Sequence, residues 1–195
     1  MPLRGAGRIR LSPTVVDPVP RGGYDVKRGE NVFESLDAVF EGLSLSPKIL
    51  RELVEAIPGP ELTAVRRPGF WSIQDHVIHL ADVQPMLYAR LVRFRDEEHP
   101  EFIPYLPDPD VPPSPGPETA DAAVALNEFA ARREKMLARI KVYPQAVWQK
   151  IGDHPEYTLY TAFGLLRHIL MHDHWHMYRI EELWLTRDQF LTELH

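Results

Sequence analysis

The chain has 195 residues, of which 44% are hydrophobic and 26% are charged, and its formal net charge is −6 at pH 7. This size and composition are typical of one soluble globular domain. The acidic balance, without a dense run of Lys and Arg, excludes nucleic acid and anionic membrane as the expected partners and leaves a small molecule or another protein. The absence of cysteine excludes disulfides, thiolate metal sites and a cysteine nucleophile, so any metal must use His, Asp or Glu.

The N-terminus carries no continuous apolar stretch, and no later segment is long and apolar enough to span a bilayer. We therefore expect a cytoplasmic protein with no secretory signal. Residues 1–30 are rich in Arg, Gly and Pro and predict an extended or disordered N-terminal arm. The predicted bundle domain covers residues 31–187, and residues 188–195 form a C-terminal tail.

Helical signals begin at Asn31, which forms a capping-box pattern with Glu34 and is followed by hydrophobic residues every three or four positions. Ser46-Pro47 is a second start signal, so this region is either one kinked helix or two short ones. Ser72, with Asp75 three residues later, predicts the cap of a second helix that continues into the nineties.

Eight prolines between positions 100 and 117 predict a stiff connector between the second and third helices. Thr119 is the expected cap of the third helix, which ends near Tyr143, and a fourth helix runs from about Thr161 to Leu185. No strand alternation persists for more than a few residues. Four long amphipathic helices predict an all-α fold, a four-helix bundle.

Residues 168–176 read HILMHDHWH, with four histidines in nine positions. At about 100° per residue, His172 and His176 fall on the seam of the fourth helix, where aliphatic residues are expected. An i, i+4 pair of imidazoles on one helix face can bridge a metal ion. The alternative is a pair of core histidines that hydrogen-bond to buried carboxylates or water.

A metal site needs a further ligand from another helix, and the second helix carries His76 and His79. His76 lies nearer the main apolar stripe, whereas His79 lies beside a second apolar patch of Val83 and Met86. Helical periodicity therefore leaves the choice open. Three imidazoles would leave a tetrahedral Zn²⁺ with one open position, and a higher coordination number would suit Ni²⁺, Fe²⁺ or Mn²⁺.

Two segments resemble a known family. FWSIQDHVIHLAD is similar to the W-S-x-x-(E/D)-x-x-x-H-L-x-D segment of the DinB/YfiT-like superfamily of four-helix-bundle metalloenzymes, and LLRHILMHDHWHMYRI is similar to its last helix. The resemblance implies that His79, His172 and His176 bind the metal and that Asp82 is a supporting carboxylate. Where the family has Gly-Gln after the last ligand, this chain has Tyr178-Arg179.

The resemblance also implies a function and an assembly. Characterised relatives include transferases and isomerases that use low-molecular-weight thiols such as bacillithiol or mycothiol, and homodimers are expected. We therefore expect one divalent ion and a thiol-dependent S-transferase or isomerase that acts on a small electrophile. A noncatalytic metal-binding or stress-response module and a metal-dependent hydrolase are the alternatives.

Further residues are candidates for supporting roles around the ion. His168 and Asp173 are placed to orient ligand imidazoles by hydrogen bonds, and Arg179 to meet an anionic substrate group at the pocket mouth. His76 remains a candidate of the same kind if His79 is the ligand. Trp71, directly before the helix cap, is expected to be a packing anchor rather than a pocket residue.

Overall fold

The computed structural model describes residues 29–104 and 121–192. The expected N-terminal arm and most of the proline-rich connector therefore lie outside the described residues. The elements in chain order are α1 (Gly29–Glu55), α2 (Gly59–Leu62), α3 (Ile73–Asp82), α4 (Gln84–Asp96), α5 (Ala122–Ile140), α6 (Gln145–Trp148), β1 (Ile151–Gly152), β2 (Tyr160–Thr161), α7 (Ala162–Leu185) and a 3-10 turn (Asp188–Phe190).

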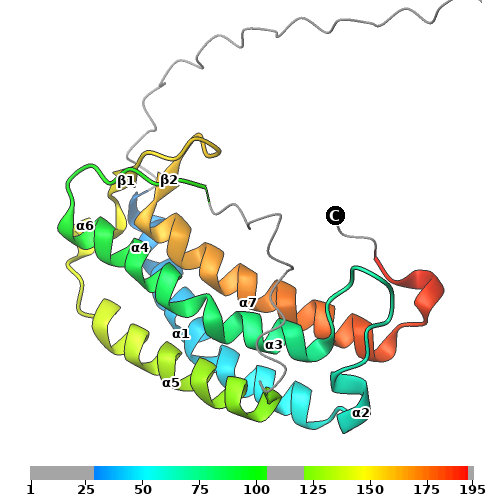
Figure 1. Ribbon diagram of the computed structural model, residues 1–195. Helices are drawn as coiled ribbons and strands as arrows, with labels where there is room; N and C mark the ends of the chain where they lie inside the picture. Colours follow the sequence, from blue (N-terminus) through cyan, green and yellow to red (C-terminus); the bar gives the residue numbers. More distant parts are fainter. Residues whose placement is uncertain (1–28, 105–120, 193–195) are drawn as a thin grey trace, which may run out of the picture.

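The long helices form a four-helix bundle, as the hydrophobic periodicity predicts (Figure 1). Helix α3 and helix α4 follow one another as one rod, and α1, α5 and α7 are the other three. Helix α3 packs against α5 and α7, and α1 packs against the same two helices. The short antiparallel pair β1–β2 lies at one end of the bundle, and α2 lies at the other.

Pro47 lies inside α1, which is one helix rather than two short ones. Proline has no N–H, so it leaves the carbonyl of Leu43, four residues earlier, without its helical donor. Arg133 of α5 fills this gap, because its Nη1 donates to the Leu43 oxygen at 3.3 Å. The sequence around Pro47 resembles a helix start, but the helix continues through it because a side chain of another helix satisfies the carbonyl that Pro47 leaves without a donor.

The prediction of a single helix from Ser72 into the nineties is wrong, because the structure divides this segment into α3 and α4 at Val83. Pro85 explains the break, since it cannot donate to the carbonyl of Ala81. Arg132 of α5 donates to that oxygen instead, from Nη1 at 2.7 Å. Two neighbouring arginines of α5 therefore satisfy the carbonyls left unbonded by two prolines.

The predicted cap at Ser72 is confirmed. The Ser72 hydroxyl accepts from the backbone N–H of Asp75 at 3.2 Å, and the Asp75 carboxylate accepts from the backbone N–H of Ser72 at 2.8 Å. Helix α7 matches its predicted bounds, and the Thr161 hydroxyl caps it by accepting from the N–H of Gly164 at 2.9 Å. The cap of α5 is Asp121, not Thr119, which lies outside the described residues.

A buried ion pair crosses the bundle between α5 and α7. Arg133 and Asp173 are 1% and 0% exposed, and two hydrogen bonds of 2.6 and 3.0 Å join the guanidinium to the carboxylate. Arg133 Nε also donates to the side-chain oxygen of Gln84 in α4 at 3.0 Å. With Leu43, this network joins all four rods of the bundle through one side chain.

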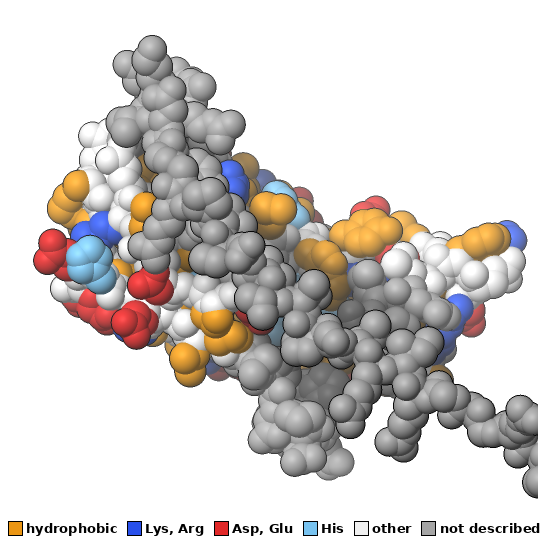
Figure 2. All heavy atoms as spheres, turned by 90° about the horizontal axis from the view of Figure 1, so that it is seen from above, with side chains coloured by type: hydrophobic (Ala, Val, Ile, Leu, Met, Phe, Trp, Pro, Cys, Tyr) orange, Lys and Arg blue, Asp and Glu red, His pale blue; other side chains and the backbone are white. Residues whose placement is uncertain are grey.

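None of the helices in the described ranges combines the length and hydropathy that a membrane-spanning segment requires. Figure 2 shows one face of the molecule, on which the visible hydrophobic side chains of the described residues lie in separate patches between charged ones. Homodimer formation stays a prediction.

Candidate metal centre

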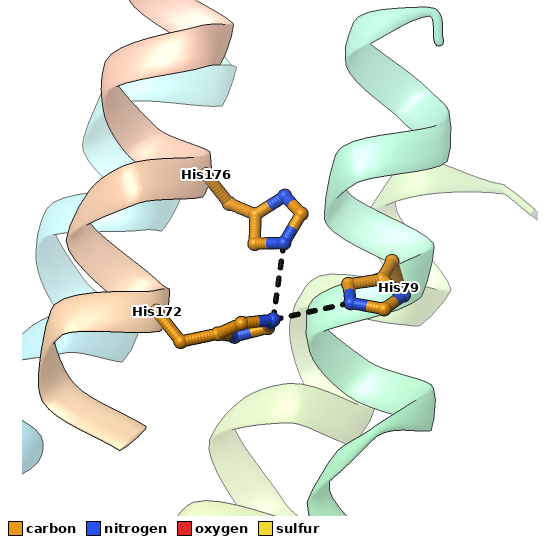
Figure 3. A group of neighbouring side chains, drawn as sticks. All are labelled: His79, His172 and His176. Atoms are coloured by element: carbon orange, nitrogen blue, oxygen red, sulfur yellow. Dashed lines mark hydrogen bonds between the residues drawn. The ribbon is translucent and has the colours of Figure 1, made fainter. Parts of the chain in front are cut away.

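Three histidines from two adjacent helices point toward a common centre (Figure 3). His79 comes from α3, and His172 and His176 come from α7. The packing of α3 against α7 places one turn of each helix opposite the other, so the i, i+4 pair faces the single histidine. The structure therefore brings together the three residues that the family resemblance implies.

The ring nitrogens of the three histidines lie within ligand distance of one ion. Nε2 of His172 is 3.2 Å from Nε2 of His79 and 3.2 Å from Nε2 of His176. One nitrogen from each ring lies within 4.8 Å of the other two. Nitrogens about 2.05 Å from a tetrahedral Zn²⁺ lie about 3.3 Å apart, so this spacing fits one small divalent ion.

Hydrogen bonds among the three rings explain the arrangement poorly. A neutral imidazole has one N–H donor and one lone pair, and the single lone pair of His172 Nε2 cannot accept well from two neighbours. Nδ1 of His172, which points away from the other two rings' converging nitrogens, is buried and has no hydrogen-bond partner among the described residues, whether or not Nε2 binds an ion. A cation that accepts three lone pairs satisfies the converging nitrogens together, so the residues fit a divalent metal.

Burial keeps the cluster neutral. It lowers the pKa of His172 to about 3, with His79, His168 and Arg133 as further causes. Burial, and then the neighbouring histidines, lowers the pKa of His176 further, and burial also lowers that of His79 although Asp82 opposes the shift. Neutral imidazole is the form that binds metals, so the site is prepared for an ion at neutral pH.

His76 does not join the three nitrogens but contacts one of their rings. Its Nδ1 lies 2.8 Å from Nδ1 of His176 and the residue is only 4% exposed. If Nε2 of His176 binds an ion, its Nδ1 carries the proton and donates to Nδ1 of His76. The proton of His76 then lies on Nε2, where it can donate to a ligand.

A pocket of about 480 Å³ opens beside the cluster, and its walls are mainly aromatic. Phe70, Trp71 and Trp175 line it together with His76, His79 and His176. The ring of Trp71 stacks on that of His176 with centroids 5.9 Å apart and lies 5.0 Å from that of His79. Trp71 therefore lines the pocket as well as packing against its neighbours, whereas the sequence predicted only the packing role.

Arg179 lines the same pocket, but its charge is already paired. Its Nη1 donates to the carboxylate of Glu182, and both side chains are buried. Glu182 also accepts from the backbone N–H of Thr192 at 2.8 Å. This pair connects α7 to the end of the described chain. The contacts of Arg179 therefore favour a structural role over the expected contact with an anionic substrate.

Two expected supporting carboxylates contact arginines rather than imidazoles. Asp82 is 57% exposed and lies 3.4 Å from Nη1 of Arg132. Asp173, buried in the ion pair with Arg133, has none of its hydrogen bonds to a described histidine. The contacts of Asp173 favour a structural role in the bundle, because its carboxylate pairs with a guanidinium on another helix, and its role in orienting an imidazole stays a prediction.

A second pocket, of about 210 Å³, also borders the cluster and shares His79 with the first. His172 and His168 line it from α7, Arg90 from α4, and His154 from the loop between the two strands. The sequence did not single out Arg90 or His154 as candidates. No local signal marks either residue, because only tertiary packing brings α4 and that loop to the histidines.

The sequence profile of the DinB superfamily matches residues 43–180, which is more than half of the chain. The chain belongs to the DinB superfamily. Among solved structures, this DinB-superfamily chain is similar to YfiT from Bacillus subtilis, described as a probable metal-dependent hydrolase with an unusual four-helix bundle topology. The identity is 23%, the alignment covers 87% of this chain and 93% of that one, and the TM-score is 0.64. No protein with a curated description matches the chain.

Proposed function

We propose that the protein is a metal-dependent enzyme in which His79, His172 and His176 bind one divalent ion. The convergence of three neutral Nε2 atoms, with two neighbouring pairs 3.2 Å apart, is the observation that carries the proposal. The group of described side chains that meets this spacing contains these three residues and no carboxylate. Three protein ligands are typical of catalytic sites, whereas structural sites usually have four.

The bound ion would supply Lewis-acid chemistry, lowering the pKa of a water or thiol at its open position so that a nucleophile exists near neutral pH. The residues of this chain supply the surroundings. Phe70, Trp71 and Trp175 bind an apolar or aromatic part of the substrate and exclude water from it. His76 holds His176 through the 2.8 Å contact and keeps an N–H for the substrate.

Hydrolysis of a small, largely apolar substrate is the leading reaction. The description of YfiT as a probable metal-dependent hydrolase supports it, and the aromatic pocket beside the three histidines offers a place for such a substrate. S-transfer from a low-molecular-weight thiol to a small electrophile is the second candidate. The second pocket supports it, because it offers a place for a cosubstrate on another side of His79.

The first experiment is metal analysis of untagged protein incubated with zinc, nickel, iron or manganese. We expect about one equivalent of ion per wild-type chain and almost none in the His172→Ala, His176→Ala double variant. His174→Ala is the matched control, since His174 is an exposed residue of the same helix. Wild-type protein that takes up no ion, or a double variant that keeps it, contradicts the proposal.

A second experiment separates the two reactions. Metal-loaded protein is screened against small esters and amides without thiol, and against small electrophiles with and without a thiol. Turnover without thiol supports the hydrolase, and turnover that requires thiol supports the transferase. A well-folded, loaded protein that is inactive in both screens would favour the noncatalytic binding module.

A further inference from the structure

We propose that the second pocket binds the carboxylate of a small ligand whose other end reaches the metal centre. The inference rests on the proposed metal site and adds a class of ligand for the second pocket, beside the apolar substrate proposed for the aromatic one. Three features of the described residues carry the argument: an arginine without a carboxylate partner, a histidine fixed as a donor, and a pocket that touches the metal-binding residues.

Arg90 is half-buried and supplies the positive charge. Its Nη2 donates to the carbonyl of Ile103 at 2.9 Å, and its Nη1 donates to the hydroxyl of Tyr160 at 3.3 Å. Both acceptors are neutral, and no described carboxylate lies within 4.0 Å of its nitrogens. Arg93, one turn later on α4, has Glu97 at 2.6 Å instead.

The two neutral contacts hold the Arg90 guanidinium in place without neutralising it. A guanidinium has five N–H donors, and the two contacts use only part of them. The planar fork matches the two oxygens of a carboxylate, which makes a fixed and unpaired arginine in a pocket a good carboxylate receptor. Arg90 therefore has both the charge and the donors that the ligand requires.

His154 supplies a second donor in the lining of the pocket. Its Nδ1 accepts from the backbone N–H of Glu156 at 3.2 Å, so the ring proton lies on Nε2. The ring is further held by Tyr157 and Tyr160, with centroids 4.8 and 4.9 Å away. The backbone thus fixes which nitrogen of His154 can donate to a ligand.

The charge of the pocket depends on the ion. Arg90 contributes +1, and Glu156, an exposed residue in the same lining, contributes −1. A divalent ion held by His79, His172 and His176 adds two positive charges at the shared wall. The loaded pocket is therefore net positive and favours an anion, and its volume of about 210 Å³ suits a short chain with a carboxylate end.

The test uses metal-loaded, full-length protein and a series of ω-mercaptocarboxylates with two to six carbons, measured by isothermal titration calorimetry. The thiol anchors each probe on the ion, and 2-mercaptoethanol is the matched probe without a carboxylate. We expect one chain length to bind at least tenfold more tightly than 2-mercaptoethanol. Arg90→Gln, which keeps a donor for Tyr160 but removes the charge, is expected to lose this preference.

Arg167→Ala is the control variant, because Arg167 is an exposed cation of α7 that does not line the pocket. It is expected to keep the full preference, and the thermal unfolding midpoint of each variant verifies folding. Thiols that bind the loaded protein equally with and without a carboxylate, or an Arg90→Gln variant that keeps the preference, would overturn the carboxylate site and leave the metal proposal intact. If the protein binds no ion, or if the loaded protein binds no thiol, the metal centre itself is contradicted, and the inference that rests on it is overturned as well.

Discussion

Replacing Asp173 with Asn tests whether this aspartate stabilises the bundle or serves the metal centre. Asp173 is 0% exposed and accepts two hydrogen bonds from Arg133, which is 1% exposed. Removing one partner of a buried ion pair leaves an uncompensated charge and costs about 3–5 kcal/mol. Because Asn keeps one oxygen acceptor, we expect a loss near 3 kcal/mol in the free energy of unfolding.

The assay is urea unfolding of the metal-free protein, followed by circular dichroism and tryptophan fluorescence. Asp82→Asn is the matched control, because Asp82 also pairs with an arginine, Arg132 at 3.4 Å, but its side chain is 57% exposed. Such an exposed pair contributes about 0–1 kcal/mol, so this variant should unfold like the wild type. Metal content is measured in parallel, and the Asp173→Asn protein that is folded should still bind about one equivalent.

Two results would refute the reasoning. A change below about 1 kcal/mol would show that the buried pair is not a major stabilising contact. Loss of the ion at unchanged stability would show that Asp173 positions an imidazole after all. The double variant Arg133→Met, Asp173→Leu removes both charges, and it should be less destabilised than Asp173→Leu alone, even though it leaves the Leu43 carbonyl without its donor.

Three further outcomes are expected. His76→Ala should weaken metal affinity by about 10- to 100-fold without abolishing binding, because it removes the hydrogen bond to the ring of His176. Unchanged affinity in a competition with a chelator would show that this hydrogen bond does not support the ligand. In the metal-free protein, burial lowers the pKa of His76 and of His172 from 6.5 to about 3. Between pH 3 and pH 6.5 the unfolded chain therefore binds more protons than the folded chain. The free energy of unfolding is highest above pH 6.5 and decreases as the pH is lowered toward 3. Each residue should cost about 1–2 kcal/mol at pH 5, and unfolding curves that coincide at pH 7 and pH 5 would contradict this. Gly152→Ala should destabilise by about 1–3 kcal/mol, because its Cβ would lie 2.7 Å from the Phe102 ring, whereas Gly59→Ala, with open space around it, should change the unfolding midpoint little.

The sequence by itself determined the long helices and two of the three candidate ligands. Hydrophobic spacing identified the long helices and placed the start of the last one near Thr161, and local cap chemistry placed a start at Ser72, because these signals depend on residues only three or four positions apart. The same local geometry placed His172 and His176 on one face of α7. The pair could therefore be read from its spacing before any tertiary contact was known.

Tertiary structure decided the contacts that cross between helices. Periodicity could not choose between His76 and His79, since both face the bundle and only the packing of α3 on α7 determines which nitrogen reaches the other two. The partner of Asp173 is 40 positions away on α5. Arg90 carries no local sign of a role.

The breaks caused by proline show the same division. Pro47 and Pro85 each remove a helical donor, but only Pro47 was interpreted from the sequence, as part of a helix-start signal, whereas the break at Pro85 was not predicted. The helix nevertheless continues through one and divides at the other, and arginines of α5 satisfy the carbonyls of Leu43 and Ala81 in the two cases. Local sequence determines where a backbone bond is lost, and the fold determines which distant side chain replaces it.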